Sequence, residues 1–141
     1  MAGDGELREE LRRYARSLGI AEDVIWLGNV NTIDEFYQGM DILLFPSLYE
    51  GLPMVLVEAQ AAGVTSLVSD TITREAMVTD YARMLPIDKG VEPWIEAGLK
   101  AVSGLVSSDR THGAKRVRDA GFDIKDTVRD LEGVYRQSIG N

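Results

Sequence analysis

Cysteine is absent from this chain of 141 residues, which excludes disulfides, cysteine-ligated zinc and thiol catalysis. Histidine occurs only once, in a polar stretch, so we expect His112 to be a surface residue rather than a catalytic base. No apolar run approaches the roughly 20 residues of a membrane span, and the opening residues MAGDGELREE have no signal-peptide pattern. We therefore expect a soluble protein in the reducing cytoplasm.

Basic residues are also in short supply. Lysine and arginine together number 15 against 23 acidic residues, which gives a net charge of -8. Nucleic acids and anionic lipid surfaces both select basic faces, so the sequence predicts no nucleic-acid partner and no direct membrane insertion. Hydrophobic residues make up 45% of the chain and charged residues 27%, an ordinary globular balance that excludes a disordered tail.

Short apolar runs alternate with amphipathic stretches along the chain. The pattern predicts strands at residues 24–27, 42–45, 66–68 and 83–87. It predicts helices at residues 6–18, 53–63, 73–79, 111–120 and 124–138, and further helices beginning at residues 32 and 93. Strands separated by helices favour parallel pairing. We therefore expect one α/β domain over residues 1–141, a Rossmann-like three-layer fold with a mostly parallel sheet of about four strands and helices on both faces.

Ligands of open α/β sheets bind where strands end and helices begin. The stretch PSLYEGLPMVLVEAQAAG, residues 46–63, places a strand end, a turn and a helix start in direct succession, with Pro53 at the first helical position. Free amides at the helix start, together with the helix dipole, are typical of an anion site suited to a diphosphate. The backbone groups concerned lie near Gly51, Leu52, Met54 and Val55.

Two carboxylates flank this helix start. Glu50 lies in the turn, and Glu58 lies inside the helix among apolar neighbours, where a carboxylate needs a partner. The vicinal hydroxyls of a ribose would supply two charge-assisted hydrogen bonds, worth about 1.5–3 kcal/mol each at best. The alternative interpretations are a turn carboxylate for Glu50 and a solvated helix residue for Glu58. We also expect Trp26 and Trp94 in the core.

The spacing of Glu50 and Glu58, with seven residues between them, resembles the nucleotide-sugar site of retaining glycosyltransferases with the GT-B fold, of the family-4 type. Other pieces follow in the order of that family's C-terminal donor domain. These are GDGELREEL (3–11), VIWLGNV (24–30), MDILLFPS (40–47) and, after the third predicted strand, Glu75 as a weak site candidate. The similarity covers nearly the whole chain and is weak beyond residue 80.

The resemblance implies a role for each matching position. Glu50 would be the catalytic residue that contacts the donor sugar and orients it, and Glu58 would bind the ribose hydroxyls. The turn and helix amides would hold sugar and diphosphate oxygens, at Gly51, Leu52, Met54 and Val55. A loop would lie against the nucleobase, at Gly28, Asn29, Val30 and Asn31.

The family reaction moves a sugar from a nucleoside diphosphate to an acceptor hydroxyl with retained configuration, in glycan or polysaccharide synthesis. The resemblance implies a UDP-sugar or GDP-sugar donor and neither a metal nor another cofactor. It also implies an N-terminal truncation, because the family's acceptor-binding domain and the first strands of its donor domain would precede this sequence. Either the remaining strands re-pair or another chain completes the sheet, and a second copy is one candidate. We expect the isolated chain to bind nucleotides weakly and to be inactive.

Two other functions remain open at this point. One is a non-catalytic nucleotide-binding or interaction module of the same fold, which differs from the first hypothesis in whether an acceptor-domain partner restores transfer. The other is a signalling domain of flavodoxin-like architecture. Such a domain needs acidic residues at a strand's carboxyl end, whereas Asp41 opens its strand, so the sequence argues against it.

Overall fold

The computed structural model describes residues 1–104 and 109–139. The chain divides into two compact units, one of residues 1–33 and one of residues 34–141. The first unit contains helix α1 (Arg8–Ser17) and the short 3-10 helix η1 (Ala21–Asp23). Helix α1 ends at Ser17 with Leu18 as its C-cap residue, and Gly19 follows with a φ of 73°. This confirms the predicted end of the helix at residue 18 to within one residue.

The strand predicted at residues 24–27 is not formed, and that prediction is wrong. Among the described residues, residues 1–3 form the only backbone pairing beside this segment, and the Met1 amino group donates to the Ile25 carbonyl at 2.6 Å. Isolated bridges at Gly28 do not extend into a ladder. Ile25 is consequently 70% exposed, because a strand buries its side chains only when neighbours cover the sheet. Trp26 is half-buried, with the Arg12 guanidinium 5.8 Å from its ring centre.

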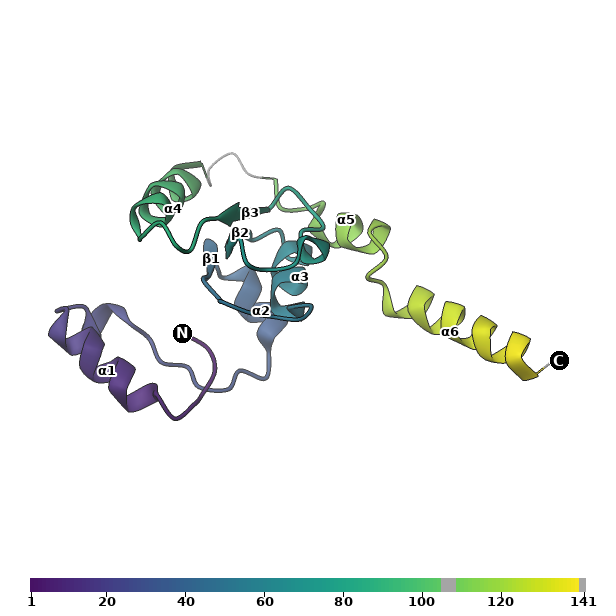
Figure 1. Ribbon diagram of the computed structural model, residues 1–141, viewed down its shortest axis with the longest axis horizontal. Helices are drawn as coiled ribbons and strands as arrows, with labels where there is room; N and C mark the ends of the chain where they lie inside the picture. Colours follow the sequence, from purple (N-terminus) through teal and green to yellow (C-terminus); the bar gives the residue numbers. More distant parts are fainter. Residues whose placement is uncertain (105–108, 140–141) are drawn as a thin grey trace. The chain divides into compact units, whose positions relative to one another are not determined.

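The second unit is built on a parallel sheet of three strands among the described residues, in the order β1-β2-β3 (Figure 1). Three of the four predicted strands are thereby confirmed, and the helix predicted at residues 73–79 shrinks to a single 3-10 turn. The strands are β1 (Ile42–Phe45), β2 (Thr65–Ser69) and β3 (Ala82–Leu85). The helices are α2 (Ile33–Gln38), α3 (Met54–Ala61), η2 (Arg74–Ala76), α4 (Glu92–Gly104), α5 (Gly113–Asp119) and α6 (Ile124–Ile139).

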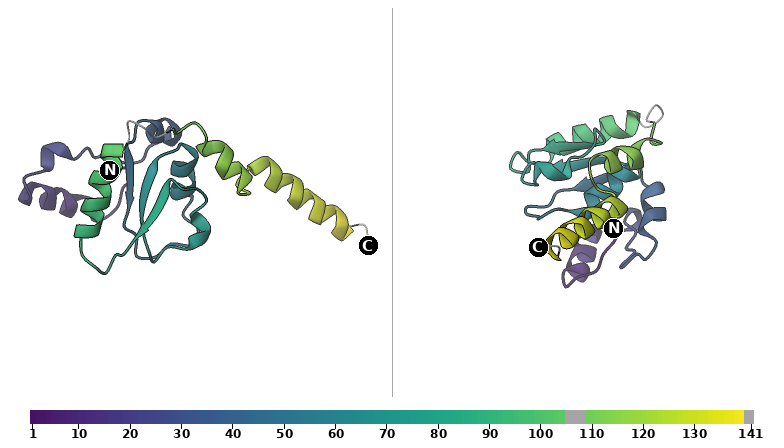
Figure 2. Two further views of the ribbon diagram at one scale, coloured as in Figure 1. Left: turned by 90° about the horizontal axis from the view of Figure 1, so that it is seen from above. Right: turned by 90° about the vertical axis from the view of Figure 1, so that its right-hand side faces the viewer.

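The central strand β2 carries core residues on both faces, since side chains alternate along a strand. Val68 points to one face and packs with Leu56 of α3. Leu67 points to the other face and packs with Leu85 of β3 and Ala97 of α4. Helices α3 and α4 therefore cover opposite faces of the sheet (Figure 2), which confirms the three-layer α/β architecture.

The edge strand and two helices keep apolar surface in solvent. Leu44 of β1 is 56% exposed, although the continuous apolar run at 42–45 is typical of a buried strand. Between β1 and α4 lies an apolar groove of about 310 Å³. Trp94 lines this groove and packs against the core. Its indole N–H donates to the Pro86 carbonyl at 2.9 Å. Helix α6 exposes an apolar stripe of Ile124, Val128, Leu131 and Tyr135.

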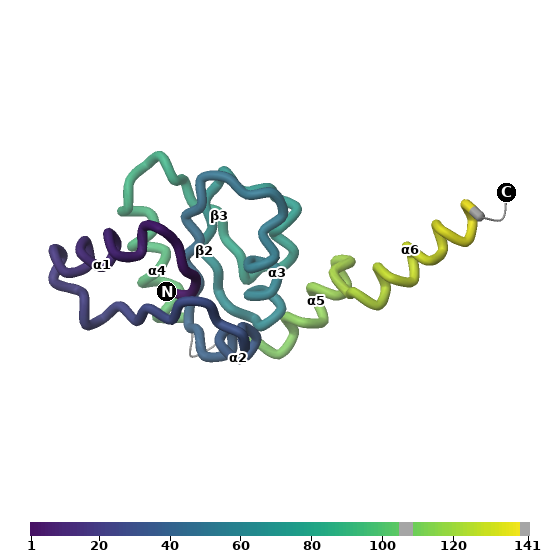
Figure 3. The backbone as a smooth tube through the Cα atoms, turned by 90° about the horizontal axis from the view of Figure 1, so that it is seen from below, coloured from purple at the N-terminus to yellow at the C-terminus, as the bar shows by residue number. Residues whose placement is uncertain are grey.

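The carboxyl-terminal end of α3 lies in backbone contact with α5 (Figure 3). A Cβ atom at Gly113 would come within 2.5 Å of the Gln60 carbonyl oxygen and 2.6 Å of that of Ala61. Gly63, which ends the helix as predicted, has a φ of 69°, and a Cβ there would lie 2.7 Å from Arg110. Only glycine allows the two segments to approach this closely.

Arg110 ties this end of α3 to α2. Its guanidinium donates hydrogen bonds to the carbonyls of Tyr37 and Met40, both at 3.0 Å, and to that of Ala62 at 3.3 Å. These carbonyls lie at or just beyond the carboxyl ends of the two helices, where backbone acceptors have no intrahelical partner and the helix dipole is negative. One side chain thus fixes the distance between α2 and α3.

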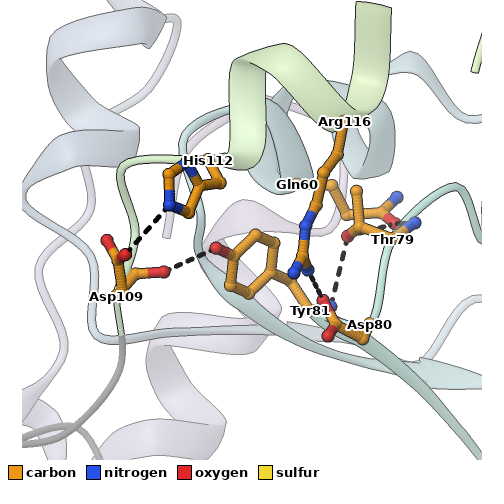
Figure 4. A network of polar contacts seen from close by, with 7 residues as sticks. All are labelled: Gln60, Thr79, Asp80, Tyr81, Asp109, His112 and Arg116. Atoms are coloured by element: carbon orange, nitrogen blue, oxygen red, sulfur yellow. Dashed lines mark hydrogen bonds and ion pairs between the residues drawn. The ribbon is translucent and has the colours of Figure 1, made fainter. Parts of the chain in front are cut away.

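A polar network joins the same part of α3 to the segment before β3 and to α5 (Figure 4). The buried Gln60 amide donates to the carbonyls of Leu56 and Ala76 and accepts from the amide and hydroxyl of Thr79. Arg116 of α5 pairs with Asp80 and lies 5.5 Å from the Tyr81 ring centre. The carboxyl-terminal half of α3 is therefore held on three sides, whereas Met54 and Val55 in its first turn are exposed.

The contact of α3 with α5 predicts a matched pair of effects on stability. We expect Gly113→Ala to lower the free energy of unfolding by about 1–3 kcal/mol, because its methyl group would overlap two carbonyl oxygens. Gly98→Ala in α4, where a Cβ meets nothing within 4 Å, should instead raise it by about 0.5–1 kcal/mol. Urea denaturation followed by circular dichroism measures both changes. Equal stabilities for the two variants would contradict the close contact.

Candidate functional site

The loop between β1 and α3 is fastened to the end of β2. The hydroxyls of Ser69 and Thr71 both lie within hydrogen-bond distance of the Ser47 carbonyl, Thr71 Oγ1 at 3.1 Å, and they lie 2.8 Å from each other. Their two protons are shared among these three oxygens. Ser69 is buried at the last position of β2, so its hydroxyl needs such an acceptor. The first turn of the loop is thereby held at the carboxyl end of the parallel sheet, the edge where ligands of this architecture bind.

Glu50 lies in this loop with one carboxylate oxygen already engaged. The Ser47 hydroxyl donates to its Oε1 at 2.8 Å, and the side chain is half-buried. Ser47 is the serine of the MDILLFPS stretch and is not among the site residues predicted from the sequence. The bond orients the carboxylate and leaves its Oε2 without a bonded partner among the described residues.

Helix α3 begins directly after the loop with unused amides. Pro53 is the N-cap residue, one position earlier than predicted, and its carbonyl accepts from the amides of Leu56 and Val57. The amides of Met54 and Val55 lie too early in the helix to have an intrahelical acceptor. They also have no other hydrogen-bond acceptor among the described residues. The side chains of Leu52, Met54 and Val55 are 44–50% exposed, so the predicted anion site faces solvent.

Glu58 lies one helical turn beyond Met54, on the solvent side of α3. Leu56 and Ala59 face the core instead. The expected partner of the carboxylate is present in part, since the Tyr37 hydroxyl of α2 donates to Glu58 Oε2 at 3.1 Å. The carboxylate itself is exposed, so the expectation that an apolar setting makes it depend on a ligand's hydroxyls is weakened. Tyr37 was placed on its helix by the sequence but not assigned to the site.

Tyr37 is buried, with 3% of its surface exposed. Burial first, and then the hydrogen bond to the Glu58 carboxylate, raise the pKa of the Tyr37 phenol above its ordinary value. The hydroxyl therefore stays protonated at physiological pH and acts toward Glu58 as a donor. The Glu50 and Glu58 carboxylates thus have the same kind of contact, because each accepts one hydrogen bond from the hydroxyl of another residue.

The loop predicted to meet a nucleobase belongs to the first unit. Gly28 is buried with a φ of 64°, and its carbonyl accepts from the Gly3 amide at 2.6 Å. Val30 is half-buried, and the side chains of Asn29 and Asn31 are exposed. The glycine therefore shapes a turn that presents two amide side chains to solvent.

The remaining polar candidates have ordinary surface positions. His112 is exposed and lies 3.3 Å from the Asp109 carboxylate (Figure 4), as expected of a surface histidine. Glu75 is exposed in η2. Lys115, Arg116 and Arg118 of α5 each pair with an aspartate. Within residues 1–104 and 109–139, no three acidic or histidine side chains gather as metal ligands, and no helix has the length and apolar character needed to cross a membrane.

The parallel sheet with helices on both faces, and the strand–loop–helix connection at its carboxyl edge, define an α/β protein of the Rossmann-like class. The family model described as Glycosyl transferases group 1 matches residues 1–101. The chain belongs to this family.

Similar proteins agree with this membership. The protein named "Putative glycosyltransferase EpsF" of Bacillus subtilis is 34% identical over 98% of this chain and 36% of its own length. The UDP-Gal:alpha-D-GlcNAc-diphosphoundecaprenol alpha-1,3-galactosyltransferase of Escherichia coli is 24% identical over 100% of this chain and 37% of its own length. The chain therefore spans little more than a third of these relatives.

A solved structure supports the fold independently. The sucrose-phosphate synthase of Thermosynechococcus elongatus superposes with a TM-score of 0.84 at 17% identity, covering 99% of this chain and 37% of that one. At this level of identity the likeness concerns the fold alone, and it confirms the Rossmann-like α/β architecture of the GT-B type.

The contact of Tyr37 with Glu58 predicts an alkaline titration. The ¹³Cζ resonance of Tyr37 should titrate well above the ordinary phenol value of about 10. Since the folded-state pKa exceeds the unfolded one, the stability that Tyr37 contributes is complete below about pH 10 and is lost as the pH rises through the folded-state pKa. NMR titration of the labelled chain measures this.

Glu58→Gln should reduce the shift without abolishing it, because burial is its larger cause. An ordinary titration of Tyr37 in the unmodified chain would contradict the buried, hydrogen-bonded position.

Proposed function

We propose that this chain binds a nucleoside-diphosphate sugar and forms the donor site of a retaining glycosyltransferase that acts on an acceptor hydroxyl in glycan or polysaccharide synthesis. One arrangement carries the proposal. Free amides open α3, and carboxylates oriented by neighbouring hydroxyls lie before and after them, at Glu50 and Glu58. Membership of the glycosyltransferase family supports the same assignment.

The order of these groups along the chain matches the order of groups in the ligand. A nucleotide sugar carries hydroxyls, then a diphosphate, then the hydroxyls of a ribose. The site offers an acceptor at Glu50, donors at the amides of Leu52, Met54 and Val55, and an acceptor again at Glu58. The rise of about 1.5 Å per helical residue puts Glu58 roughly 6 Å along α3 from Met54. Amides would hold the anion, and carboxylates would accept from the hydroxyls.

The chemistry assigned to these residues is electrostatic. Glu50 would orient the transferred sugar, and the amides, including that of Gly51, would stabilise charge on the leaving diphosphate without a metal or another cofactor. The helix start contributes about 0.3–2 kcal/mol toward an anion. Gly28, Asn29, Val30 and Asn31 would contact the base. UDP and GDP both suit such a loop, and the name of the Escherichia coli relative specifies a UDP-sugar.

Transfer needs more than this chain. The relatives are nearly three times as long, and we propose that an acceptor-binding domain supplies the second substrate. The inactivity of the isolated chain and its cytoplasmic location stay predictions from the sequence.

A titration with nucleotides tests the donor site. We expect amide NMR shifts at residues 50–58 and 28–31 on addition of UDP or GDP and their sugars, with a dissociation constant on the order of millimolar, near -4 kcal/mol. Glu58→Ala should weaken the binding of the preferred nucleotide, because its ribose loses an acceptor.

Lys115→Ala, in an exposed ion pair on α5, is the matched control and should leave the binding unchanged. If no shift develops at millimolar ligand, the donor site is not formed in this chain. The interpretation as a non-catalytic module of the same fold would then replace it.

A second copy of the chain is the partner we propose for the open sheet edge. The outer edge of β1 has no strand beside it among the described residues. Of the two alternatives, re-pairing of the remaining strands is therefore not observed at this edge, and completion by another chain remains. Edge strands with exposed apolar side chains are templates for pairing with another chain. The groove between β1 and α4 continues this apolar surface beyond Leu44.

Sedimentation velocity at increasing concentration tests the association. We expect the unmodified chain to associate and Leu44→Lys to remain monomeric, because a charge at the strand edge opposes pairing. Leu131→Lys is a matched control at similar exposure, 53% against 56%, on the stripe of α6. Loss of association in Leu131→Lys alone would move the interface to α6.

A further inference from the structure

Two residues outside the predicted site bear on Glu58. Tyr37 reaches Glu58 Oε2 with its hydroxyl at 3.1 Å, across the space between α2 and α3. The phenol ring is buried, so the hydroxyl has little freedom to follow the carboxylate if the carboxylate moves. The bond therefore restricts Glu58 more than it restricts Tyr37.

The backbone of Tyr37 is itself fixed. Arg110 donates to the Tyr37 carbonyl and, through the same guanidinium, to Ala62, which follows the last turn of α3. The amide of Ala62 in turn bonds to the Glu58 carbonyl at 3.0 Å. Arg110 thus fixes the distance between the carboxyl ends of α2 and α3. This distance allows the Tyr37 hydroxyl to reach Glu58, which lies one helical turn before Ala62.

We propose that Tyr37 is a positioning residue that holds the Glu58 carboxylate in the orientation in which it accepts from ribose hydroxyls, with Arg110 fixing the helix that carries it. This inference rests on the proposed nucleotide site. The phenol engages one lone pair of Oε2 and orients Oε1 and the remaining lone pairs toward solvent, where a ligand's hydroxyls can donate. The phenol itself makes no contact with the ligand.

A purely structural role for Tyr37 makes a different prediction. Loss of a buried hydrogen bond would then lower stability and weaken all ligands alike. A positioning role instead changes the ratio between a nucleotide that has ribose hydroxyls and one that lacks them. The ratio is therefore the quantity to measure.

The test measures the affinity of two nucleotides by NMR titration of the 141-residue chain and of Tyr37→Phe. One is UDP or GDP, whichever binds more tightly, and the other is its 2′,3′-dideoxy analogue. We expect the unmodified chain to prefer the ribonucleotide. Tyr37→Phe should reduce that preference about three- to tenfold, the size of one hydrogen bond, with the affinity for the dideoxy analogue unchanged. The side-chain methylene order parameters of Glu58 should fall in the same variant.

Tyr81→Phe is the matched control, because it also removes a hydroxyl that donates within the protein, to the Asp109 carbonyl at 2.6 Å (Figure 4), and this hydroxyl has no hydrogen bond to Glu58 among the described contacts. It should leave the preference unchanged. A preference kept in Tyr37→Phe, or lost equally in both variants, would overturn the positioning role and leave the proposed function intact. An unmodified chain that binds both nucleotides equally would instead overturn the ribose role of Glu58 and the inference with it.

Discussion

The anchoring of α3 at its carboxyl-terminal end is the constraint on which the rest of the structure depends. Gly113 brings α5 against the last carbonyls of the helix, Gln60 joins it to the segment before β3, and Arg110 joins it to α2. These contacts fill the buried half of the helix with satisfied polar groups and leave its first turn free. A helix fixed at one end presents unused amides at the other without having to order a loop when a ligand arrives, which lowers the entropic cost of binding.

The two carboxylates are likewise ordered before a ligand binds. Carboxylates on a protein surface rotate among several rotamers, and ordering one on binding opposes affinity. Ser47 and Tyr37 each remove part of this freedom beforehand through one O–H bond, and each is fixed in turn, Ser47 by hydroxyls at the end of β2 and Tyr37 by burial and Arg110. Short chains of hydrogen bonds from the core therefore fix the orientation of the two carboxylates. Each carboxylate still has free lone pairs that could accept from a ligand.

The sequence could predict what local pattern determines. The apolar runs that became β1, β2 and β3, the strand–turn–helix around Glu50 and the glycine stop after α3 all follow from periodicity and turn chemistry. The segment at 24–27 has the same apolar character, but a strand also needs a neighbouring strand to pair with. Residues 1–3 are too short to form one, so no strand develops at 24–27. The contacts of Tyr37 and Arg110 link positions 21 and 73 residues apart, which no local pattern encodes. The exposure of Glu58 depends likewise on which face of α3 meets the sheet.

The charge of the chain limits how an anionic ligand can be held. With a net charge of -8, the protein repels a diphosphate at long range, and a Debye length of about 8 Å at physiological salt confines that repulsion to near approach. Attraction must then come from groups in direct contact. The amides at the start of α3 could meet this requirement because they carry partial positive charge without a counter-ion. The hydroxyl bonds to Glu50 and Glu58 leave carboxylate lone pairs that, in the proposed site, would accept from a ligand's hydroxyls. A ligand that presented only an anion would leave the remaining lone pairs of both carboxylates without donors, whereas the proposed ligand, with hydroxyls on both sides of its diphosphate, would supply them.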